Sequence, residues 1–392
     1  MKISVHKILF RLFLICILAN WQIESSAQDS SRLRISLLTC TPGDELYSIF
    51  GHSAIRIIDS NSVSDIVYNY GTFNFDDEGF YLKFIRGKLL YYISTENFND
   101  ADGYMGFKHL YQSTNRGMTE QVLDLTAAEK QYIRNSLHEN LKEENKYYKY
   151  DFFLDNCTTR LRDLLLKTKN PPPQLPAVMP ANTRFRQAIH LYLDKGKQYW
   201  SKLGIDILLG APTDAVMTPS QQQFLPDNLM MAMDKSKPAM VVSSASLYPL
   251  PDSNKEDSWF TPLFFFSALL IGFVLLSLSK SKFIQNILLG LDGLLFFTTG
   301  LLGILLIFMW TSTDHSMTKD NYNLLWALPS HIVISFFINS RKKIIKGYFL
   351  FTAISLVIVL LAWFFLPQQL NNALIPFILL LLYRSAMKYF RQ

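Results

Sequence analysis

The chain has 392 residues, of which 49% are hydrophobic and 18% charged, and its formal net charge is +6. Many basic residues lie beside long apolar runs near the C-terminus, so the charge follows largely from membrane topology and gives no argument for a nucleic-acid partner. There is no internal repeat, P-loop, dinucleotide fingerprint or clustered Cys/His pattern, so the sequence supports neither a cofactor nor a metal site.

Residues 1–27 have the features of a signal peptide. Basic residues precede an apolar stretch over 12–19, and Ser25-Ser26-Ala27 predicts cleavage after Ala27. Cys16 leaves with this segment, and the bulky Ile15 before it does not suit a lipoprotein signal. The mature chain therefore starts outside the cytoplasm.

The first part of the mature chain is predicted to be rich in antiparallel strands. Residues 34–39 alternate weakly, and residues 48–58 and 66–71 flank a turn at 59–62, as in a hairpin. We expect one periplasmic catalytic domain over residues 28–240, because the roughly 230 residues between the signal peptide and the membrane segments are enough for one sizeable core.

His52 is the candidate general base of this domain. In the predicted hairpin it lies across from Tyr68, Asn69 and Tyr70, whose side chains alternate between the two faces. We choose Asn69 as its partner, since an amide can hold one ring nitrogen and fix the imidazole tautomer. A strand histidine with a structural hydrogen bond is the alternative.

Cys157 is the candidate nucleophile. The sequence FFLDNCTTRLRDLLL at 152–166 predicts a helix that begins at Asp155 or Asn156, with Cys157 in its first turn. Free N–H groups and the positive helix dipole at that position stabilise a thiolate and can later hold an oxyanion. A core cysteine, or a disulfide with Cys40 in this oxidising compartment, is the competing interpretation.

Further elements of the domain follow from local patterns. The stretch YLKFIRGKLLYY at 81–92 mixes aromatic and cationic residues, as on a solvated face or a lipid headgroup surface. We predict a strand at 122–125, helices at 126–141 and 182–199, loops at 210–214 and 224–229, and a linker over 241–260. Pro171-Pro172-Pro173 closes the Cys157 helix region.

The last part of the chain, 261–392, is predicted to be an all-α transmembrane domain of about five helices. Apolar runs cover 261–279, 284–310, 324–340, 347–366 and 371–383, with four spans and a re-entrant segment as the fallback. Basic residues fall on alternate connections, which predicts an inner-membrane protein with residues 28–260 in the periplasm and a cytoplasmic C-terminus. They are Lys280, Lys282, Arg341, Lys342, Lys343, Lys346, Arg384, Lys388 and Arg391.

In this sequence the candidate histidine lies in a strand and precedes the candidate cysteine, which lies at the start of a helix. This order resembles that of the circularly permuted papain-like fold of the lecithin:retinol acyltransferase type, which is an α+β fold. More closely, LLTCTPGDELYSIFGHSAIRI, VYNYGTF, NRGMTEQVLDL, YDFFLDNCTTRLRD and FLPDNL resemble the periplasmic domain of the Lnb family of bacterial lipoprotein N-acyltransferases. DHSMTKDNYNLLWALP resembles the membrane domain of that family.

This resemblance implies transfer of a fatty acyl chain from a membrane phospholipid to the α-amino group of a lipoprotein's diacylglyceryl-cysteine. The nucleophile role then falls on Cys157 and the base role on His52, with Asn69 as the less certain third residue. We expect Asn156, Thr158, Arg160 and Tyr70 to contact substrate. His315, in the loop after the second span, is expected to orient a headgroup or accept the amine's proton.

Two other functions remain open at this point. The same Cys157 and His52 suit a membrane-anchored cysteine hydrolase that cuts peptidoglycan peptides or lipid amides. A Cys40–Cys157 disulfide would instead leave no nucleophile and favour a non-enzymatic assembly factor.

Overall fold

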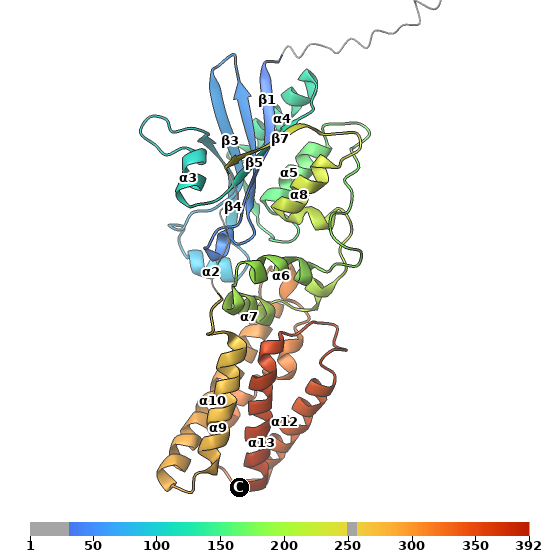
Figure 1. The fold of residues 1–392 in the computed structure, drawn as a ribbon. Helices are drawn as coiled ribbons and strands as arrows, with labels where there is room; N and C mark the ends of the chain where they lie inside the picture. The colour runs from blue at the N-terminus through green and yellow to red at the C-terminus, as the bar shows by residue number, and fades with distance from the viewer. Residues whose placement is uncertain (1–30, 249–256, 392) are drawn as a thin grey trace, which may run out of the picture.

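The computed structural model describes residues 31–248 and 257–391. A domain built on a β-sheet stands on one end of a bundle of long helices, and the C-terminus lies at the far end of that bundle (Figure 1). The predicted signal peptide and residues 249–256 of the predicted linker lie outside the described residues.

The sheet is antiparallel throughout and has the strand order β6-β4-β3-β2-β1-β5-β7. Alternating apolar residues in the central strands turn one set of side chains to each face. The strands are β1 (Leu33–Cys40), β2 (His52–Asp59), β3 (Ser64–Thr72), β4 (Leu90–Asn97), β5 (Met118–Leu123), β6 (Tyr147–Lys149) and β7 (Val241–Tyr248).

Helices α4 (Ala127–Asn140) and α5 (Cys157–Leu166) cover one face of this sheet. Their apolar residues, such as Ile133 and Leu161, are fully buried against β1, β2 and β3. On the other face, α3 (Phe107–Ser113) contributes Phe107 and Tyr111 to a smaller core. The sheet domain therefore has a core on each side.

The prediction of a linker from residue 241 is wrong for its first part, because residues 241–248 form strand β7. This strand pairs with β5 at the edge of the sheet. Its side chains are mostly exposed. Because this edge strand is open to water, its sequence is as polar as that of a linker, and hydrophobicity does not distinguish the two. The sheet domain thus extends past residue 240.

Three other boundaries differ from the sequence patterns. The stretch 81–92 divides into the short helix α2 (Phe80–Ile85) and the start of β4, and the helix expected at 182–199 is α6 (Phe185–Lys195) followed by α7 (Tyr199–Leu208). The loop expected at 224–229 is instead the start of α8 (Pro226–Asp234), with proline at the first helical position, where it is tolerated. Short 3-10 turns, η1 (Leu46–Ser48), η2 (Ala211–Asp214) and η3 (Gln221–Phe224), join these elements.

The bundle contains α9 (Pro262–Leu278), α10 (Lys282–Thr311), α12 (Lys343–Leu361) and α13 (Ile375–Arg391). In the described part of the chain, three helices are long and apolar enough to cross a bilayer: Lys282–Thr311, Lys343–Leu361 and Asn372–Phe390. Helix α9 is apolar but shorter. The fifth predicted segment forms a longer helix than its apolar run suggested. Pro376 does not interrupt this helix, because it lies in the first turn of α13, where proline is tolerated.

The third predicted span, 324–340, is not one continuous helix. It consists of η5 (Tyr322–Leu325), the short α11 (His331–Ser335) and turns around Pro329. A Cβ atom at Gly303 would lie 2.1 Å from the Ala327 carbonyl oxygen, and one at Gly300 would lie 2.2 Å from the Ile332 nitrogen. The broken segment is therefore packed directly on α10, as irregular backbone at membrane depth requires.

Two basic residues that the sequence assigned to a cytoplasmic connection lie inside α13. Arg384 makes a bidentate ion pair with Asp292 of α10 at 2.6 and 2.7 Å, and Lys388 binds the same carboxylate at 2.9 Å. Asp292 is fully buried. This cluster joins α10 to α13 and neutralises the negative charge of Asp292 within the second predicted span.

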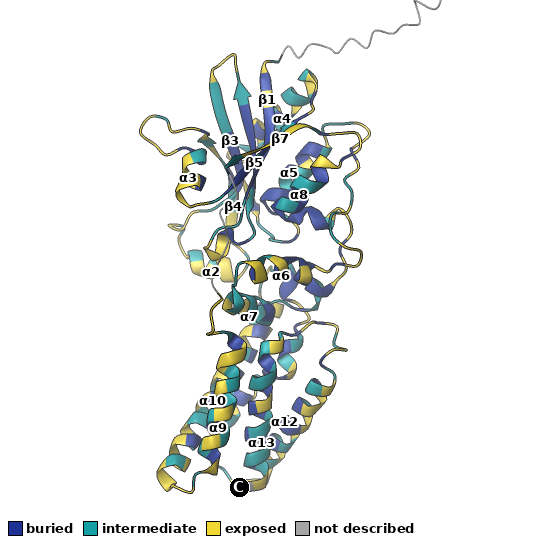
Figure 2. Cartoon of the chain, in the orientation of Figure 1, coloured by how far each residue is buried: buried dark blue, intermediate teal, exposed yellow. Residues whose placement is uncertain are grey.

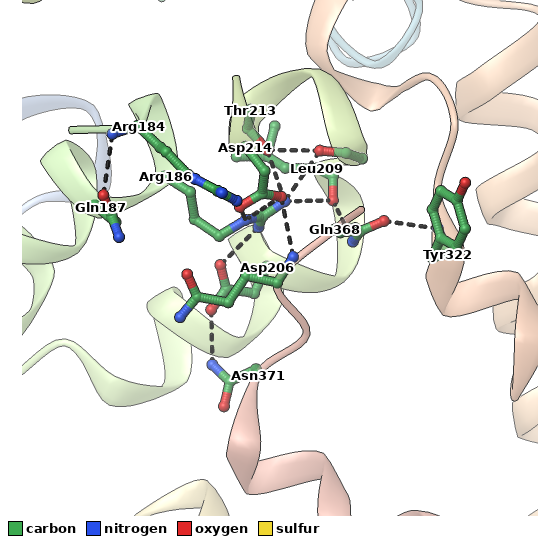
Figure 3. Close-up of polar contacts among 12 residues, drawn as sticks. Arg184, Arg186, Gln187, Asp206, Leu209, Thr213, Asp214, Tyr322, Gln368 and Asn371 are labelled. Carbon is green, nitrogen blue, oxygen red and sulfur yellow. Dashed lines mark hydrogen bonds and ion pairs between the residues drawn. The ribbon is translucent and has the colours of Figure 1, made fainter. Parts of the chain in front are cut away.

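The sheet domain is fixed to the bundle through Arg186 of α6, which is fully buried (Figure 3). Its guanidinium binds Asp206 at 2.8 Å and Asp214 at 3.1 Å. Asn371 of the membrane domain donates to the Asp206 carboxylate at 2.8 Å, and the backbone N–H of Gln369 donates to Asp214 at 3.2 Å. One cation thus organises two carboxylates that both domains share.

Candidate active site

Cys157 is the first residue of α5, and local sequence explains that position. The side chain of Asn156 accepts a hydrogen bond from the N–H of Thr159, and the Thr159 hydroxyl accepts one from the N–H of Asn156. This reciprocal cap starts the helix at Cys157. The cysteine side chain is buried, and it contacts the hydroxyl of Thr158 at 3.8 Å and the backbone N–H of Ser53.

His52 is the first residue of β2 and is hydrogen-bonded to Cys157. The preceding Gly51 has φ +81°, and a Cβ atom there would lie 2.7 Å from the backbone oxygen of Cys40. Only glycine fits this turn without strain. The turn therefore delivers His52 to the strand end beside the start of α5.

A row of polar groups fixes the orientation of the imidazole. The Nε2 atom of His52 lies 3.1 Å from Oδ1 of Asn69, and the amide nitrogen of Asn69 donates to Glu96 at 3.2 Å. Because the Glu96 carboxylate accepts from the Asn69 amide nitrogen, the amide oxygen faces His52 and Nε2 carries the hydrogen. The other ring nitrogen, Nδ1, is then the one available to the thiol.

The electrostatics favour an ionised pair. Burial raises the pKa of Cys157, but the positive charge of His52, its hydrogen bond, and those from Ser53 and Thr158 bring the pKa to about 7. Burial lowers the pKa of His52, yet the charge of Cys157 and hydrogen bonds to Cys157 and Asn69 raise it overall. Each partner stabilises the charged form of the other.

Cys40 and Cys157 are both free thiols, so the disulfide considered from the sequence is not formed in this structure. Cys40 is directly opposite His52 in the β1–β2 register and is fully buried. Burial raises the pKa of its thiol to about 12, against a weaker opposing effect of Arg116 and a hydrogen bond with Tyr111. Cys157 is therefore the more acidic of the two thiols.

Comparison with known proteins gives two matches that together span most of the chain. Residues 19–185 match the Lnb N-terminal periplasmic domain, and residues 254–392 match the Lnb transmembrane domain. The chain belongs to the Lnb family. It is accordingly a membrane protein of lipoprotein N-acyltransferase type, with a periplasmic domain joined to an inner-membrane domain. No curated protein and no solved structure matches it.

The Lnb periplasmic domain brings Cys157, His52 and Asn69 together, while two of the predicted substrate residues beside them are occupied by protein contacts. Asn156 caps α5, and its amide nitrogen donates to the carbonyls of Phe152 and Phe224 at 2.7 and 2.9 Å. Thr158 is fully buried and bonds the Ser53 hydroxyl at 3.1 Å. Thr158 thus holds α5 against β2, and Asn156 holds the start of α5 against η3.

Arg160 and Tyr70 lie next to each other, and both contact Tyr148. Arg160 makes a bidentate ion pair with Asp155 at 2.7 Å, and its guanidinium lies 3.4 Å from the ring centroid of Tyr148. Tyr70 accepts a hydrogen bond from Asn140. Both residues line a surface hollow of about 670 Å³, in which the Arg160 side chain is partly exposed and Tyr70 is buried.

His315 does not join the Cys157 group. Its Nε2 atom lies 3.1 Å from the carbonyl oxygens of Phe84 and Ile85, at the end of α2. The neighbouring Asp314 binds Lys149 at 2.8 Å. In the Lnb architecture seen here, this loop fastens the membrane domain to the sheet domain.

Sequence patterns missed Glu96 and Tyr148. Glu96 is the acidic residue of β4, and only the pairing of β4 with β3 brings it to Asn69. The hydroxyl of Tyr148 is buried and has no hydrogen-bond partner among the described residues. A Cβ atom at Gly71 would lie 4.0 Å from that hydroxyl and 3.7 Å from Cβ of Cys157, so Tyr148 and Cys157 both lie beside Gly71.

Metal ligation has no candidate group in the described residues. Within 31–248 and 257–391, no three His, Cys, Asp or Glu side chains gather as a metal site would require.

Proposed function

We propose that this protein transfers a fatty acyl chain from a membrane phospholipid, through a thioester on Cys157, to the α-amino group of a lipoprotein's diacylglyceryl-cysteine. The observation that carries the proposal is the thiol of Cys157, with a pKa of about 7, hydrogen-bonded to His52 in a domain that stands on a membrane bundle. Membership of the Lnb family supports the reaction class.

In the first half-reaction His52 accepts the thiol proton at Nδ1, and the thiolate attacks the ester carbonyl of the phospholipid. A C–S bond forms and the ester C–O bond breaks. The departing lysophospholipid alkoxide takes the proton from His52, which acts now as the general acid. Asn69 and Glu96 serve as positioning residues that keep Nδ1 directed at the sulfur.

Two kinds of donor suit the oxyanion of the tetrahedral intermediate. The first N–H groups of a helix have no carbonyl acceptor within the helix. The N–H groups of Cys157 and Thr158 lie at the start of α5 and can therefore donate to an oxyanion. We assign the Tyr148 hydroxyl as a further donor, because it is buried, unpartnered and next to Cys157. Fixed donors of this kind stabilise charge only where it develops.

In the second half-reaction the α-amine of the lipoprotein attacks the thioester carbonyl. The C–N bond of the amide forms, the C–S bond breaks, and His52 accepts the proton from nitrogen before returning it to the thiolate of Cys157. Amines attack thioesters readily, so the protein mainly has to keep water out until the amine arrives.

The topology supports the permuted papain-like fold as part of this proposal. The base comes first on a strand of an antiparallel sheet, and the nucleophile follows at the start of a helix that packs on the same sheet. We also propose a cytoplasmic C-terminus, since the C-terminal end of the bundle is the end remote from the periplasmic domain (Figure 1).

Two experiments test the reaction. Intact-mass analysis of the protein after incubation with phospholipid should find an acyl adduct on Cys157 that hydroxylamine removes. In cells whose sole copy carries Cys157→Ala, mass spectrometry should find lipoprotein N-termini without the added acyl chain, whereas Cys40→Ala should keep it. Normal N-acylation with Cys157→Ala would overturn the proposal, and peptide cleavage without an acyl adduct would favour the cysteine hydrolase.

A further inference from the structure

Helix α2 carries an apolar surface that no other described element covers. Tyr81, Leu82 and Phe84 are 77%, 60% and 51% exposed, and Ile85 is exposed as well. Figure 2 shows this short helix mostly in the colour of exposed residues, at the end of the sheet domain that faces the bundle. Large apolar side chains grouped in this way mark a contact surface.

The membrane domain itself holds α2 in this place. The N–H of Asp314 donates to the carbonyl of Arg86 at 2.9 Å, and His315 bonds the carbonyls of Phe84 and Ile85. Helix α10 ends at Thr311, a few residues earlier in the chain. Consequently α2 lies beside the point where a membrane-spanning helix leaves the bilayer.

A basic hollow of about 500 Å³ adjoins this helix. Its lining includes Lys83, Lys88 and Lys146 but only one acid, Asp77, so its net charge is positive. Lys83 binds Asp77 at 2.9 Å, and Lys146 lies 5.1 Å from the ring centroid of Tyr92. Ammonium groups with aromatic neighbours suit the phosphate and glycerol region of a phospholipid.

We propose that α2 lies in the headgroup layer of the periplasmic leaflet, with Tyr81, Leu82 and Phe84 among the lipids and the lysine-lined hollow holding a phospholipid phosphate. The occupant is the lipid surface because this face continues from the emerging membrane helix and joins apolar with basic side chains. A partner protein would have no need of the fixed attachment to the loop after α10.

A row of aromatic rings links this surface to the nucleophile. Phe80 of α2 is 5.9 Å from Phe73, Phe73 is 5.3 Å from Tyr91, and Tyr91 stacks on Tyr150 at 4.4 Å between centroids. A Cβ atom at Gly71 would lie 3.6 Å from the Tyr150 ring and 3.7 Å from Cβ of Cys157. The row is a continuous set of packed rings from α2 to the neighbourhood of the thiol. That an acyl chain follows it rests on the proposed function, whereas the membrane contact does not.

Photo-crosslinking separates the membrane contact from catalysis. The full chain with Cys157→Ala, carrying p-benzoylphenylalanine in place of Tyr81, is reconstituted in vesicles of phosphatidylethanolamine and phosphatidylglycerol and irradiated. Mass spectrometry should find phospholipid adducts at this position. Tyr104 is the matched control, since it is 79% exposed but precedes α3.

Two results overturn the proposal: equal lipid adducts at both positions, or no lipid adduct at position 81. A crosslink from position 81 to another protein would make α2 a protein contact instead.

The phosphate site is tested with a double variant. Lys88→Gln with Lys146→Gln should lower the phosphatidylglycerol adduct several-fold. Lys142→Gln should not, because Lys142 pairs with Glu139 away from the hollow. An unchanged adduct in the double variant would remove the phosphate site. Because the experiment uses an inactive variant, its outcome does not depend on acyl transfer.

Discussion

The Nε2 atom of His52 is 3.1 Å from the amide oxygen of Asn69, and Asn69 in turn donates to Glu96. This relation determines which ring nitrogen can accept a proton from Cys157. It also separates two contributions to the base: the position of the ring, which the hairpin provides, and its tautomer, which the amide provides.

Asn69→Ala should lower the rate of acyl-enzyme formation by roughly 10- to 100-fold, a part of the factor of about 10²–10⁴ that a positioned acid–base group supplies. Glu96→Gln should have a smaller effect, because a glutamine oxygen still accepts from the Asn69 amide. The measurement is the rate of thioester formation by intact mass. Ser94→Ala is the control, since Ser94 bonds Thr72 and not His52. Equal rates for Asn69→Ala and the unmodified protein would contradict the role of the amide.

Alkylation of the two cysteines should depend on pH in different ways. The thiolate is the nucleophile, so iodoacetamide should modify Cys157 with a midpoint near its pKa of about 7, while Cys40, with a pKa of about 12, stays unmodified at neutral pH. His52→Ala removes the favourable charge and hydrogen bond and should move the Cys157 midpoint upward. Peptide mapping after alkylation gives both values, and an unshifted midpoint in His52→Ala would show that the imidazole does not stabilise the thiolate.

Local patterns were sufficient to predict where the candidate nucleophile Cys157 and the candidate base His52 lie in the fold. The cap formed by Asn156 and Thr159 lies within four residues of sequence, and the His52 hairpin lies within about twenty, so both could be predicted from neighbouring residues. The contact with Glu96 depends on the register of a further strand. Residues 241–248 were predicted as linker and not as strand β7 for the same reason, because the partner strand β5 is more than a hundred residues away.

Arg186→Met should destabilise the protein by about 3–5 kcal/mol, because it leaves the buried carboxylate of Asp214 without its cation and that of Asp206 with His190 as its remaining ion-pair partner. Thermal unfolding of the purified full chain in detergent measures this loss. Arg184→Met is the matched control, since Arg184 lies two residues away and is exposed. Equal melting temperatures for the two variants would mean that Arg186 does not hold the domains together.

Gly303→Ala should destabilise the bundle by about 1–3 kcal/mol, the usual cost of overpacking, because the new Cβ would meet the Ala327 carbonyl oxygen at 2.1 Å. Gly290 is on the same helix and has no described atom within 4 Å of its would-be Cβ. Gly290→Ala should therefore be neutral or slightly stabilising. Chemical unfolding in detergent compares the two, and equal stability would argue against close packing of the broken segment.

Hydropathy could not predict that packing. The run 324–340 is apolar enough for a span, but Pro329 interrupts it, and Asn321 and Asn323 direct their amides to backbone oxygens of residues 206–208 in the sheet domain. The contacts that shape this segment come from two regions distant in sequence, α7 and the glycines of α10. A count of apolar residues along the sequence contains no information about these contacts.

Tyr148→Phe tests the proposed oxyanion donor most directly. Burial first, and then the nearby thiolate of Cys157, raise the pKa of Tyr148, so its hydroxyl stays protonated and can donate at neutral pH. The substitution keeps the ring beneath the Arg160 guanidinium and removes only the oxygen. We expect kcat to fall by roughly 10- to 100-fold with little change in KM, because the lost bond forms only as charge develops. Tyr104→Phe, at an exposed position before α3, should leave kcat unchanged, and a Tyr148→Phe variant with normal kcat would assign the oxyanion to the α5 N–H groups alone.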